Sequence, residues 1–456
     1  MFLFDSSLYR ISPVWLQEAA IFAVLSVRRR MREGARFRKG LAELEKTQWM
    51  STAALREYQE AHVRATLQNA AIRVPFYRQR FAREGVQIDE RAGTQTLEKV
   101  SKLTKREVMS AGKTMLAQGR WGLRFKGATS GTTGLSMIGY RNLRAVNYEN
   151  AFLARQLAWA GYQPGDRRAW IRGDMVTPIS QARPPYWRRN RADNSLMMSS
   201  FHLSEQTAPQ YIAALEQFDP VIIQAYPSSI AFLARYLESR GKTYNGKSLR
   251  GIVTSSETVL DEQRKVVEKT MGARLFDWYG SFERVAAIGT CEQGQYHLLS
   301  DYSYVELLPI GDGAVELVGT SFFNDLMPFI RYQIGDAVVP EPAEFRCPCG
   351  REFPAIRSIR GRMDDYVVTP DGRHIGMMAN MFDGVDFLLE GQVIQDQRDR
   401  LRVLLVPVRR LQSEDFQDLE RRARLLVGPE MRIAFEIVDE IPRTGGGKLR
   451  VVVRNF

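Results

Sequence analysis

Three cysteines and one histidine form the pattern in this sequence that most directly indicates chemistry. Cys291 precedes His297 by six residues, and Cys347 and Cys349 follow in a Cys-Pro-Cys-Gly segment. Structural Zn²⁺ takes four tetrahedral sulfur and nitrogen ligands, and a glycine turn after a C-x-C pair can direct two thiolates at one ion. The pattern predicts a Cys₃His zinc site, with three unrelated free thiols as the alternative.

Residues 128–134 read Ala-Thr-Ser-Gly-Thr-Thr-Gly, directly after a strand-like segment. Hydroxyl side chains interleaved with glycines allow O–H and backbone N–H groups to converge on phosphate oxygens. No Gly-Lys-Ser/Thr closes the segment, which disfavours the P-loop nucleotidases. An ordinary polar loop is the alternative. The candidate phosphate ligands are Thr129, Ser130, Gly131, Thr132, Thr133 and Gly134.

Two later segments each place a carboxylate at the end of a predicted strand. Tyr279, before Gly280, can offer its ring face to a purine. Glu283 can hold Mg²⁺ on phosphates, because Mg²⁺ prefers hard oxygen ligands. A strand followed by a capped helix is the alternative for this segment. Asp336 ends the apolar segment 328–336, where acidic residues of α/β proteins commonly accept ribose hydroxyls.

In their order and separations, these segments resemble the adenylate-forming enzymes. The resemblance is to their phenylacetate-CoA ligase-like branch, which includes proteins of capsular polysaccharide clusters. It also rests on the Arg-Val-Pro-Phe-Tyr-Arg segment at 73–78, on 359–365 with Arg362, and on Lys448 after three glycines. It covers nearly the whole chain.

The resemblance implies a role for each candidate residue. It implies that 129–134 hold the β- and γ-phosphates of ATP, and that the branch's metal-like cluster stands at the four zinc candidates. The remaining implied roles are adenine-pocket lining for Ser256 and Glu257, adenine stacking for Tyr279, Mg²⁺ binding for Glu283, ribose binding for Asp336, ribose or phosphate contact for Arg362, and charge stabilisation during adenylation for Lys448.

The implied reaction joins a carboxylic acid to AMP with release of pyrophosphate, and then transfers the acyl group to coenzyme A. One alternative is transfer to an amine or hydroxyl acceptor. A second alternative is a scaffold that has lost turnover. Glu283, Asp336, Arg362 and Lys448 occur together in this chain, and a scaffold does not need all four.

The sequence departs from the family at three positions. Leu135-Ser136-Met137 replaces the usual proline and lysine after the phosphate loop, which removes one cation from the leaving pyrophosphate. Phe282 stands where the family has threonine or serine before the glutamate, so we expect it to narrow the carboxylate pocket. Gly446 replaces the serine of the usual Ser-Gly-Lys, and we expect this change to have little effect on adenylation.

The elements that must position these residues are those of an α/β fold. Residues 1–95 form a helical segment, and 220–227, 230–237 and 251–254 read as strand, helix and strand, the order of a parallel sheet. Ligands bind at strand C-termini in such sheets, so we expect Tyr226, Ser256 and Tyr279 to face one crevice. We therefore predict a large N-terminal domain, 1–361, with mixed or parallel sheets and helices. After it we predict a small, mobile α+β domain, 362–456, with strands at 366–368, 401–406 and 433–438 around a helix at 413–426.

The net charge of +12 is concentrated in two clusters, one of which, 28–39, follows the apolar helical stretch 13–27. This order is typical of a peripheral membrane contact. The alternative is a solvated basic helix that covers its own domain. The second cluster, 183–191, can attract an anionic substrate. Zinc-finger spacing, ribonucleoprotein motifs and basic repeats are absent, so no nucleic-acid partner is expected.

Composition indicates a large protein with no spanning helix. A chain of 456 residues that is 44% hydrophobic and 25% charged can bury more than one core. It contains no run of 18 uncharged apolar residues and no signal-peptide pattern. Three cysteines with a proposed metal role argue against a disulfide framework, so we expect a cytoplasmic protein.

Overall fold

The computed structural model describes residues 6–119, 122–128, 137–174, 176–178, 181–362, 366–370, 374–376, 378–382, 385, 387–443 and 449–456. The chain forms two compact units, each built from segments far apart in the sequence. Unit 1 contains Met1–Leu25, Ala160–Asp277 and Arg360–Phe456. Unit 2 contains Ser26–Trp159 and Trp278–Ile359. The boundary expected between residues 361 and 362 falls at the end of strand β14 (Ala355–Arg362) and stays a prediction.

The N-terminal part of the chain is helical, as the sequence predicts. Ser51 caps the longest helix, α5, by accepting the N–H of Ala54, and Thr104 and Glu107 form a capping box on α8. The helices are α2 (Ser7–Ile11), α3 (Val14–Arg32), α4 (Ala35–Thr47), α5 (Thr52–Arg73), α6 (Pro75–Glu84), α7 (Thr94–Glu98) and α8 (Lys105–Ala111), followed by the 3₁₀ turn η1 (Gly112–Met115).

Unit 2 contains an antiparallel sheet and a separate hairpin. The sheet has the order β11-β12-β13-β14-β10-β9-β8, and the hairpin β1–β2 leads into helix α9 (Leu143–Trp159). Arg155 on α9 makes a bidentate, fully buried ion pair with Asp301, at 2.5 and 3.0 Å. Loss of either partner would leave the other charge buried and unpaired. The strands are β1 (Arg124–Ala128), β2 (Ile138–Asn142), β8 (Arg274–Gly280), β9 (Ala287–Thr290), β10 (Tyr296–Leu298), β11 (Ser303–Gly311), β12 (Ala314–Ser321), β13 (Tyr332–Pro340) and β14.

Unit 1 contains the predicted parallel sheet. Strands β3, β5, β6 and β7 pair in parallel, and β4 pairs antiparallel with β5. The predicted strand, helix and strand between 220 and 254 are confirmed as β6, α11 and β7. The elements are β3 (Arg168–Arg172), β4 (Trp187–Asn190), β5 (Ser195–Ser199), η2 (Ser200–His202), α10 (Ala208–Phe218), β6 (Ile222–Ala225), α11 (Pro227–Glu238), β7 (Gly251–Ser255) and α12 (Asp261–Met271).

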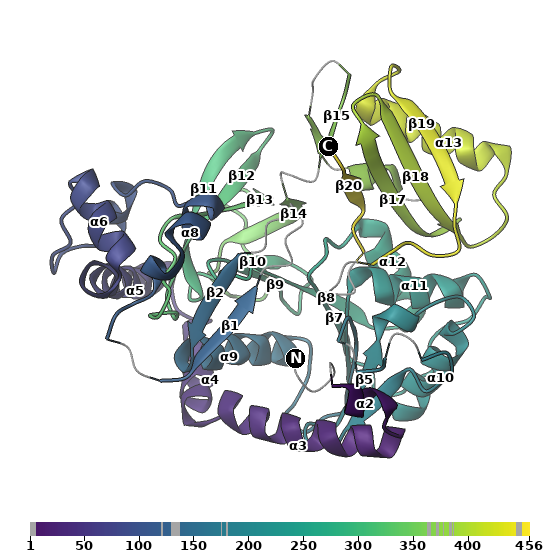
Figure 1. Ribbon diagram of the computed structural model, residues 1–456, viewed down its shortest axis with the longest axis horizontal. Helices are drawn as coiled ribbons and strands as arrows, with labels where there is room; N and C mark the ends of the chain where they lie inside the picture. Colours follow the sequence, from purple (N-terminus) through teal and green to yellow (C-terminus); the bar gives the residue numbers. More distant parts are fainter. Residues whose placement is uncertain are drawn as a thin grey trace. The chain divides into compact units, whose positions relative to one another are not determined.

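The C-terminal part of unit 1 is a small α+β module, as expected. Helix α13 packs its apolar side, including Leu419 and Ala423, onto the sheet β19-β18-β17-β20 (Figure 1). Strands β17 and β18 are antiparallel, and β19 and β20 are each parallel to a neighbour. The elements are β15 (Tyr366–Val368), β16 (His374–Gly376), η3 (Met378–Phe382), β17 (Leu388–Gln397), β18 (Arg400–Pro407), α13 (Ser413–Val427), β19 (Arg432–Ile437) and β20 (Val452–Arg454).

The module is attached to the rest of unit 1 by apolar and polar contacts. Leu389, Ile394 and Val406 belong to the same buried cluster as the residues of α10 and α11. Arg235 on α11 donates a 2.7 Å hydrogen bond to the carbonyl of Leu389.

The helices and sheets described above confirm the predicted α/β class. Every helix in the described part of the chain is too short or too polar to cross a bilayer.

Candidate functional site

Two tyrosine–carboxylate pairs connect the end of strand β8 to strand β13. Tyr279 Oη donates a 2.5 Å hydrogen bond to Asp336 Oδ2, and Tyr332 Oη donates a 2.8 Å bond to Glu283 Oε1. Each segment thus supplies one tyrosine and one carboxylate, four residues apart. Asp336 and Tyr332 are buried, whereas Tyr279 and Glu283 are half-buried. The arrangement fixes both carboxylates through bonds that cross between two segments more than 40 residues apart.

The turn that carries Glu283 follows directly from the end of β8. Gly280 is exposed at the strand end, and Arg284 closes the turn with its N–H on the carbonyl of Ser281, at 3.1 Å. Arg284 adopts a φ of +58°, in the left-handed region that non-glycine residues rarely occupy. Its side chain reaches the carbonyl of Ala145 at 2.7 Å and Glu149 at 3.3 Å. The strained turn is therefore held on α9 as well as on β13.

The ring of Phe282 lies against the hairpin β1–β2. Gly127 and Gly139 are direct partners across the hairpin, and a Cβ atom at either position would lie 2.9 or 2.6 Å from the ring. The Arg141 guanidinium stands 4.1 Å from the ring centroid and donates a 2.6 Å bond to the Phe282 carbonyl. Burial, with Arg284 nearby, lowers the pKa of Arg141 to about 10. The ring thus packs on the hairpin, and the expected narrowing of a carboxylate pocket stays a prediction.

Glu257 lies in unit 1, and both of its carboxylate oxygens accept backbone N–H groups. Oε2 accepts from Ser228 at 3.0 Å, in the first turn of α11, and Oε1 accepts from Leu449 at 2.9 Å. A carboxylate at a helix N-terminus satisfies donors that have no partner within the helix. Burial raises the pKa of Glu257 although both hydrogen bonds oppose this shift. Its neighbour Ser256 is exposed, with a φ of +77°.

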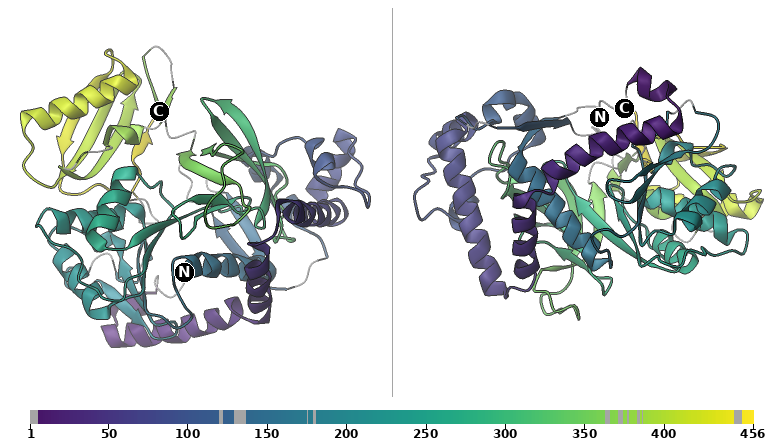
Figure 2. Two further views of the ribbon diagram at one scale, coloured as in Figure 1. Left: turned by 180° about the vertical axis from the view of Figure 1, so that it is seen from behind. Right: turned by 90° about the horizontal axis from the view of Figure 1, so that it is seen from below.

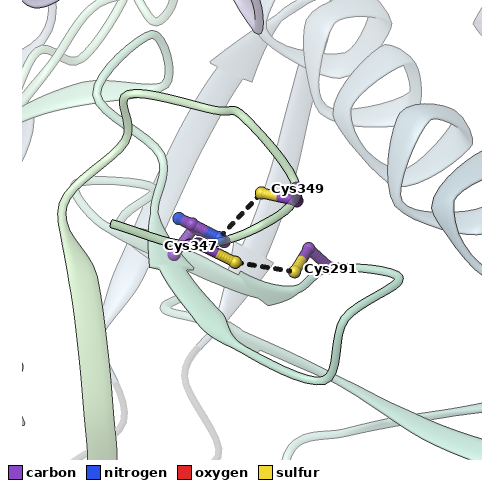
Figure 3. Close-up of side chains that lie close together, drawn as sticks. Cys291, Cys347 and Cys349 are labelled. Carbon is purple, nitrogen blue, oxygen red and sulfur yellow. Dashed lines mark hydrogen bonds between the residues drawn. The ribbon is translucent and has the colours of Figure 1, made fainter. Parts of the chain in front are cut away.

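The four candidate metal ligands come together in unit 2. Their ligand atoms all lie within 4.8 Å of one another, with 3.8 Å between the sulfurs of Cys291 and Cys347 and 3.4 Å between Cys349 Sγ and His297 Nε2. Figure 3 shows the three thiols directed toward one another. Ligand atoms about 2.3 Å from one ion at tetrahedral angles would be separated by about 3.8 Å. The donor set and its spacing therefore fit Zn²⁺.

Both loops that carry the cysteines are shaped around the sulfur atoms. The N–H of Gln293 points to Cys291 Sγ at 3.4 Å, and the N–H of Arg351 points to Cys349 Sγ at 3.5 Å. Each loop closes through a left-handed glycine, Gly294 with φ +86° and Gly350 with φ +79°. Backbone N–H groups directed at sulfur stabilise thiolates, so the loops favour the form that binds a metal.

Hydrogen bonding and burial prepare the imidazole as well. His297 Nδ1 lies 3.1 Å from the carbonyl of Phe353, which leaves Nε2 facing the sulfur atoms. Burial lowers the pKa of His297, so the ring is neutral, as a ligand must be. Burial raises the pKa of Cys291, and it raises the pKa of Cys347 to about 12. Without a cation these two groups are thiols, and metal binding would release their protons.

Arg351 connects the cysteine loops to the N-terminal helices. It pairs with both oxygens of Glu292 at 2.8 and 2.9 Å, and it donates a 3.2 Å bond to Gln48 Oε1. Its guanidinium also stacks on Trp49 and Trp159, at 4.6 and 4.2 Å. The candidate metal site therefore lies in a rigid, largely buried environment.

Comparison with known proteins identifies relatives over most of the chain. A family model described as the CapK C-terminal domain matches residues 367–455. Protein CapK of Staphylococcus aureus is 27% identical over 73% of this chain and 74% of its own length. The phenylacetate-coenzyme A ligase of Escherichia coli (strain K12) is 26% identical over 90% of this chain and 97% of its own length. A phenylacetate-coenzyme A ligase of Pseudomonas putida is 28% identical over 72% of this chain and 75% of its own.

The fold agrees with these sequence relationships. A solved 2-hydroxyisobutyryl-CoA ligase in its postadenylation state superposes with a TM-score of 0.69 at 17% identity, covering 90% of this chain and 92% of that one. The chain belongs to the adenylate-forming superfamily, in the branch of the phenylacetate-CoA ligases and CapK. At this identity the structural match shows the shared fold alone. The resemblance inferred from the sequence motifs is confirmed.

The nucleotide-site residues predicted from the sequence fall into three groups. Tyr279, Gly280, Glu283 and Asp336 lie together in unit 2, and Ser256 and Glu257 lie in unit 1. Arg362 ends strand β14. The phosphate-loop candidates Thr129–Gly134 and Lys448 lie outside the described residues. The roles assigned to all of these residues stay predictions.

Sequence reasoning missed the residues that hold the predicted ones in place. Tyr332 could have been found, because it precedes Asp336 by the same four residues that separate Tyr279 from Glu283. Arg141 and Arg351 carried no local signal, since their partners are distant in the chain.

Proposed function

We propose that this protein activates a carboxylic acid with ATP and transfers the acyl group to coenzyme A. The observation that carries the proposal is the pair of tyrosine–carboxylate bonds, which holds the candidate Mg²⁺ ligand Glu283 and the candidate ribose ligand Asp336 on one body. Membership in a superfamily that contains phenylacetate-CoA ligases supports the same reaction.

In the first step, a carboxylate oxygen of the acid attacks the α-phosphorus of ATP. The new O–P bond forms as the bond to pyrophosphate breaks, and an acyl-adenylate results. Acid and nucleotide repel each other, so the site must neutralise charge on the leaving pyrophosphate. We assign this task to Lys448 and to the N–H and O–H groups of 129–134, and ribose binding to Asp336 and Arg362. We assign adenine stacking to Tyr279, whose hydroxyl bonds to Asp336.

In the second step, the thiol of coenzyme A attacks the acyl carbon. A C–S bond forms, the C–O bond to AMP breaks, and the thiol proton is released. We propose that the C-terminal module, joined through Arg362 and the residues after it, moves between the two steps and exchanges Lys448 for the acceptor.

Two metal ions have candidate ligands in this chain. Glu283 would hold Mg²⁺, which neutralises phosphate charge when bound. Cys291, His297, Cys347 and Cys349 would hold a structural Zn²⁺ in a closed Cys₃His sphere with no position left for substrate. Its ligands would join the β9–β10 loop and strand β10 to the segment between β13 and β14, so zinc would stabilise the strands that carry the site residues.

Product analysis tests the reaction and its acceptor. Pyrophosphate release is measured against a panel of aryl, fatty and amino acids, and products are separated by chromatography with coenzyme A supplied or withheld. An acyl-CoA that appears only with coenzyme A supports the proposal. Acid-dependent pyrophosphate release with no thioester would instead indicate an amine or hydroxyl acceptor, and no release with any acid would indicate a scaffold.

A further inference from the structure

Large apolar side chains are exposed in one short stretch of the N-terminal helices. Seven of the 15 large hydrophobic residues exposed in the described part of the chain lie between positions 8 and 27. Single exposed apolar residues are normal, but a contiguous group marks an interaction surface. The seven are Leu8, Ile11, Trp15, Leu16, Phe22, Val24 and Val27, with exposures from 38% to 80%.

Helical spacing gathers most of these residues on the outer side of helix α3. Trp15 and Phe22 are seven residues apart and lie nearly in line along the helix, while Leu16 and Val27 lie about 100° further round, on the other flank of the outer side. Ile21, on the opposite side, is fully buried. Figure 2 shows α3 as one uninterrupted helix. Its inner side buries Ile21 and Gln17, and its outer side is apolar, whereas an ordinary surface helix has a polar outer side.

Buried polar contacts fix which side of the helix faces outward. Gln17 is buried and donates 2.9 Å bonds to the carbonyls of Tyr9 and Ser12. Its Oε1 accepts a 2.5 Å bond from Arg188, whose side chain is fully buried. Rotation of α3 to hide Trp15 and Phe22 would leave these groups without partners in the interior, a costly change. The apolar outer side is thus a stable property of the fold.

A basic segment follows the apolar one along the chain. Residues 28–39 contain seven basic side chains and one acidic residue, Glu33, which pairs with Arg29 at 2.8 Å. All seven basic residues are exposed. They are Arg28, Arg29, Arg30, Arg32, Arg36, Arg38 and Lys39.

We propose that helix α3, with α2 before it, docks on an anionic phospholipid bilayer. The helix would lie in the plane of the membrane surface, with Trp15 and Phe22 among the acyl chains and Arg28 to Arg30 among the lipid phosphates. A nucleic acid would use the charges without the apolar side. A second copy of this chain would bury the apolar side, but it would bring two strongly basic segments to one interface. The anionic bilayer alone uses both features. This proposal does not depend on the reaction proposed above.

Vesicle flotation with the full chain tests the proposal. We expect binding to vesicles of phosphatidylcholine mixed with phosphatidylglycerol, and much weaker binding to phosphatidylcholine alone. Replacement of Arg28, Arg29 and Arg30 by Gln should weaken binding on the order of a hundredfold, because each basic residue near an anionic surface contributes about a factor of five. Replacement of Trp15 and Phe22 by Ser should weaken it by more than about tenfold, from the apolar area lost.

Matched control variants distinguish binding through this surface from nonspecific adsorption of the protein to vesicles. Ile72→Ser with Ile310→Ser removes two comparably exposed apolar residues elsewhere. Arg56, Arg83 and Lys113, all exposed, can be changed to Gln as the charge control. Both controls should bind like the wild type. Equal losses in test and control variants, or no binding by the wild type, would overturn the proposal.

Light scattering distinguishes the alternative occupant. A wild-type dimer that becomes a monomer on replacement of Trp15 and Phe22, with no vesicle binding by either protein, would assign the surface to a second copy.

Discussion

The contact of Phe282 with the glycines of the β1–β2 hairpin can be tested with a double-mutant cycle. Phe282→Ala removes a half-buried ring that covers Gly127 and Gly139 and stacks on Arg141. A fully buried phenylalanine truncation costs about 3–5 kcal/mol, and about half of that applies to a half-buried ring. The lost cation–π contact adds about 1 kcal/mol. We expect the hairpin to be destabilised by about 2.5–3.5 kcal/mol.

Gly139→Ala tests the same contact from the other side. The added methyl would lie 2.6 Å from one ring atom and 3.1 Å from the next, so in the wild type it should cost about 1–3 kcal/mol through overpacking. After Phe282→Ala the ring is gone, and the same substitution should become neutral or stabilising by about 0.5 kcal/mol, because alanine has less freedom to lose than glycine. The two effects must therefore be non-additive.

Hydrogen exchange at the amides of β1 and β2 is the local measurement, because it reports the free energy of opening this hairpin rather than of global unfolding. Ile138→Ala, one residue away and 47% exposed, is the matched control and should have the same effect with or without Phe282. A coupling between Gly139→Ala and Phe282→Ala below about 0.5 kcal/mol would refute the reasoning.

Four further predictions concern the proposed reaction and its supports. Lys448→Ala should reduce pyrophosphate release by about a hundredfold or more, the usual loss for one transition-state donor, with thermal stability unchanged; adenylation within about threefold of wild type would contradict the assignment. Tyr332→Phe removes the hydrogen bond to Glu283 and should raise the Mg²⁺ concentration needed for half-maximal rate by up to about tenfold, whereas an unchanged requirement would place Mg²⁺ elsewhere. Cys349→Ser, or a chelator, should lower the melting temperature and release zinc, which elemental analysis measures. If wild-type protein purified without added metal holds less than about a tenth of an equivalent of zinc, the three cysteines are ordinary thiols and the metal site is refuted. Glu257→Ala leaves the N–H of Leu449 without its acceptor, so exchange at that amide should speed up by about five- to a hundredfold, and equal rates would show that the contact contributes nothing in solution.

Local patterns in the sequence predicted the local elements and the groups of residues with shared chemistry. The strand, helix and strand between 220 and 254 follow from hydrophobic period and length, and so do the strands and helix after 400. The cluster of Cys291, His297, Cys347 and Cys349 was predictable because its chemistry restricts which residues can take part. A resemblance across ordered motifs supplied the rest of the candidate site.

Contacts between distant segments could not be predicted in this way. The position of Phe282 depends on Gly127 and Gly139, both far earlier in the chain, and only the register of β1 and β2 places these two glycines side by side under the ring. The outward side of α3 was equally hidden, because apolar residues occupy both sides of the helix. The buried side of the helix is identified by Gln17, which accepts a hydrogen bond from Arg188, far along the chain. The sequence contains these partners but no local signal that joins them.

The predicted carboxylate Glu283 is held by residues to which the resemblance assigns no role. Glu283 depends on Tyr332, and its turn depends on Phe282, Arg141 and the hairpin that leads into and out of the phosphate-loop residues. Strand β8 also pairs with β9, whose following loop carries Cys291. A ring in place of the usual threonine or serine therefore exchanges one polar group for a contact that couples the Mg²⁺ candidate to the β1–β2 hairpin. On this argument the departure at 282 changes how the site is supported, while Glu283 and Asp336 keep their hydrogen bonds to Tyr332 and Tyr279.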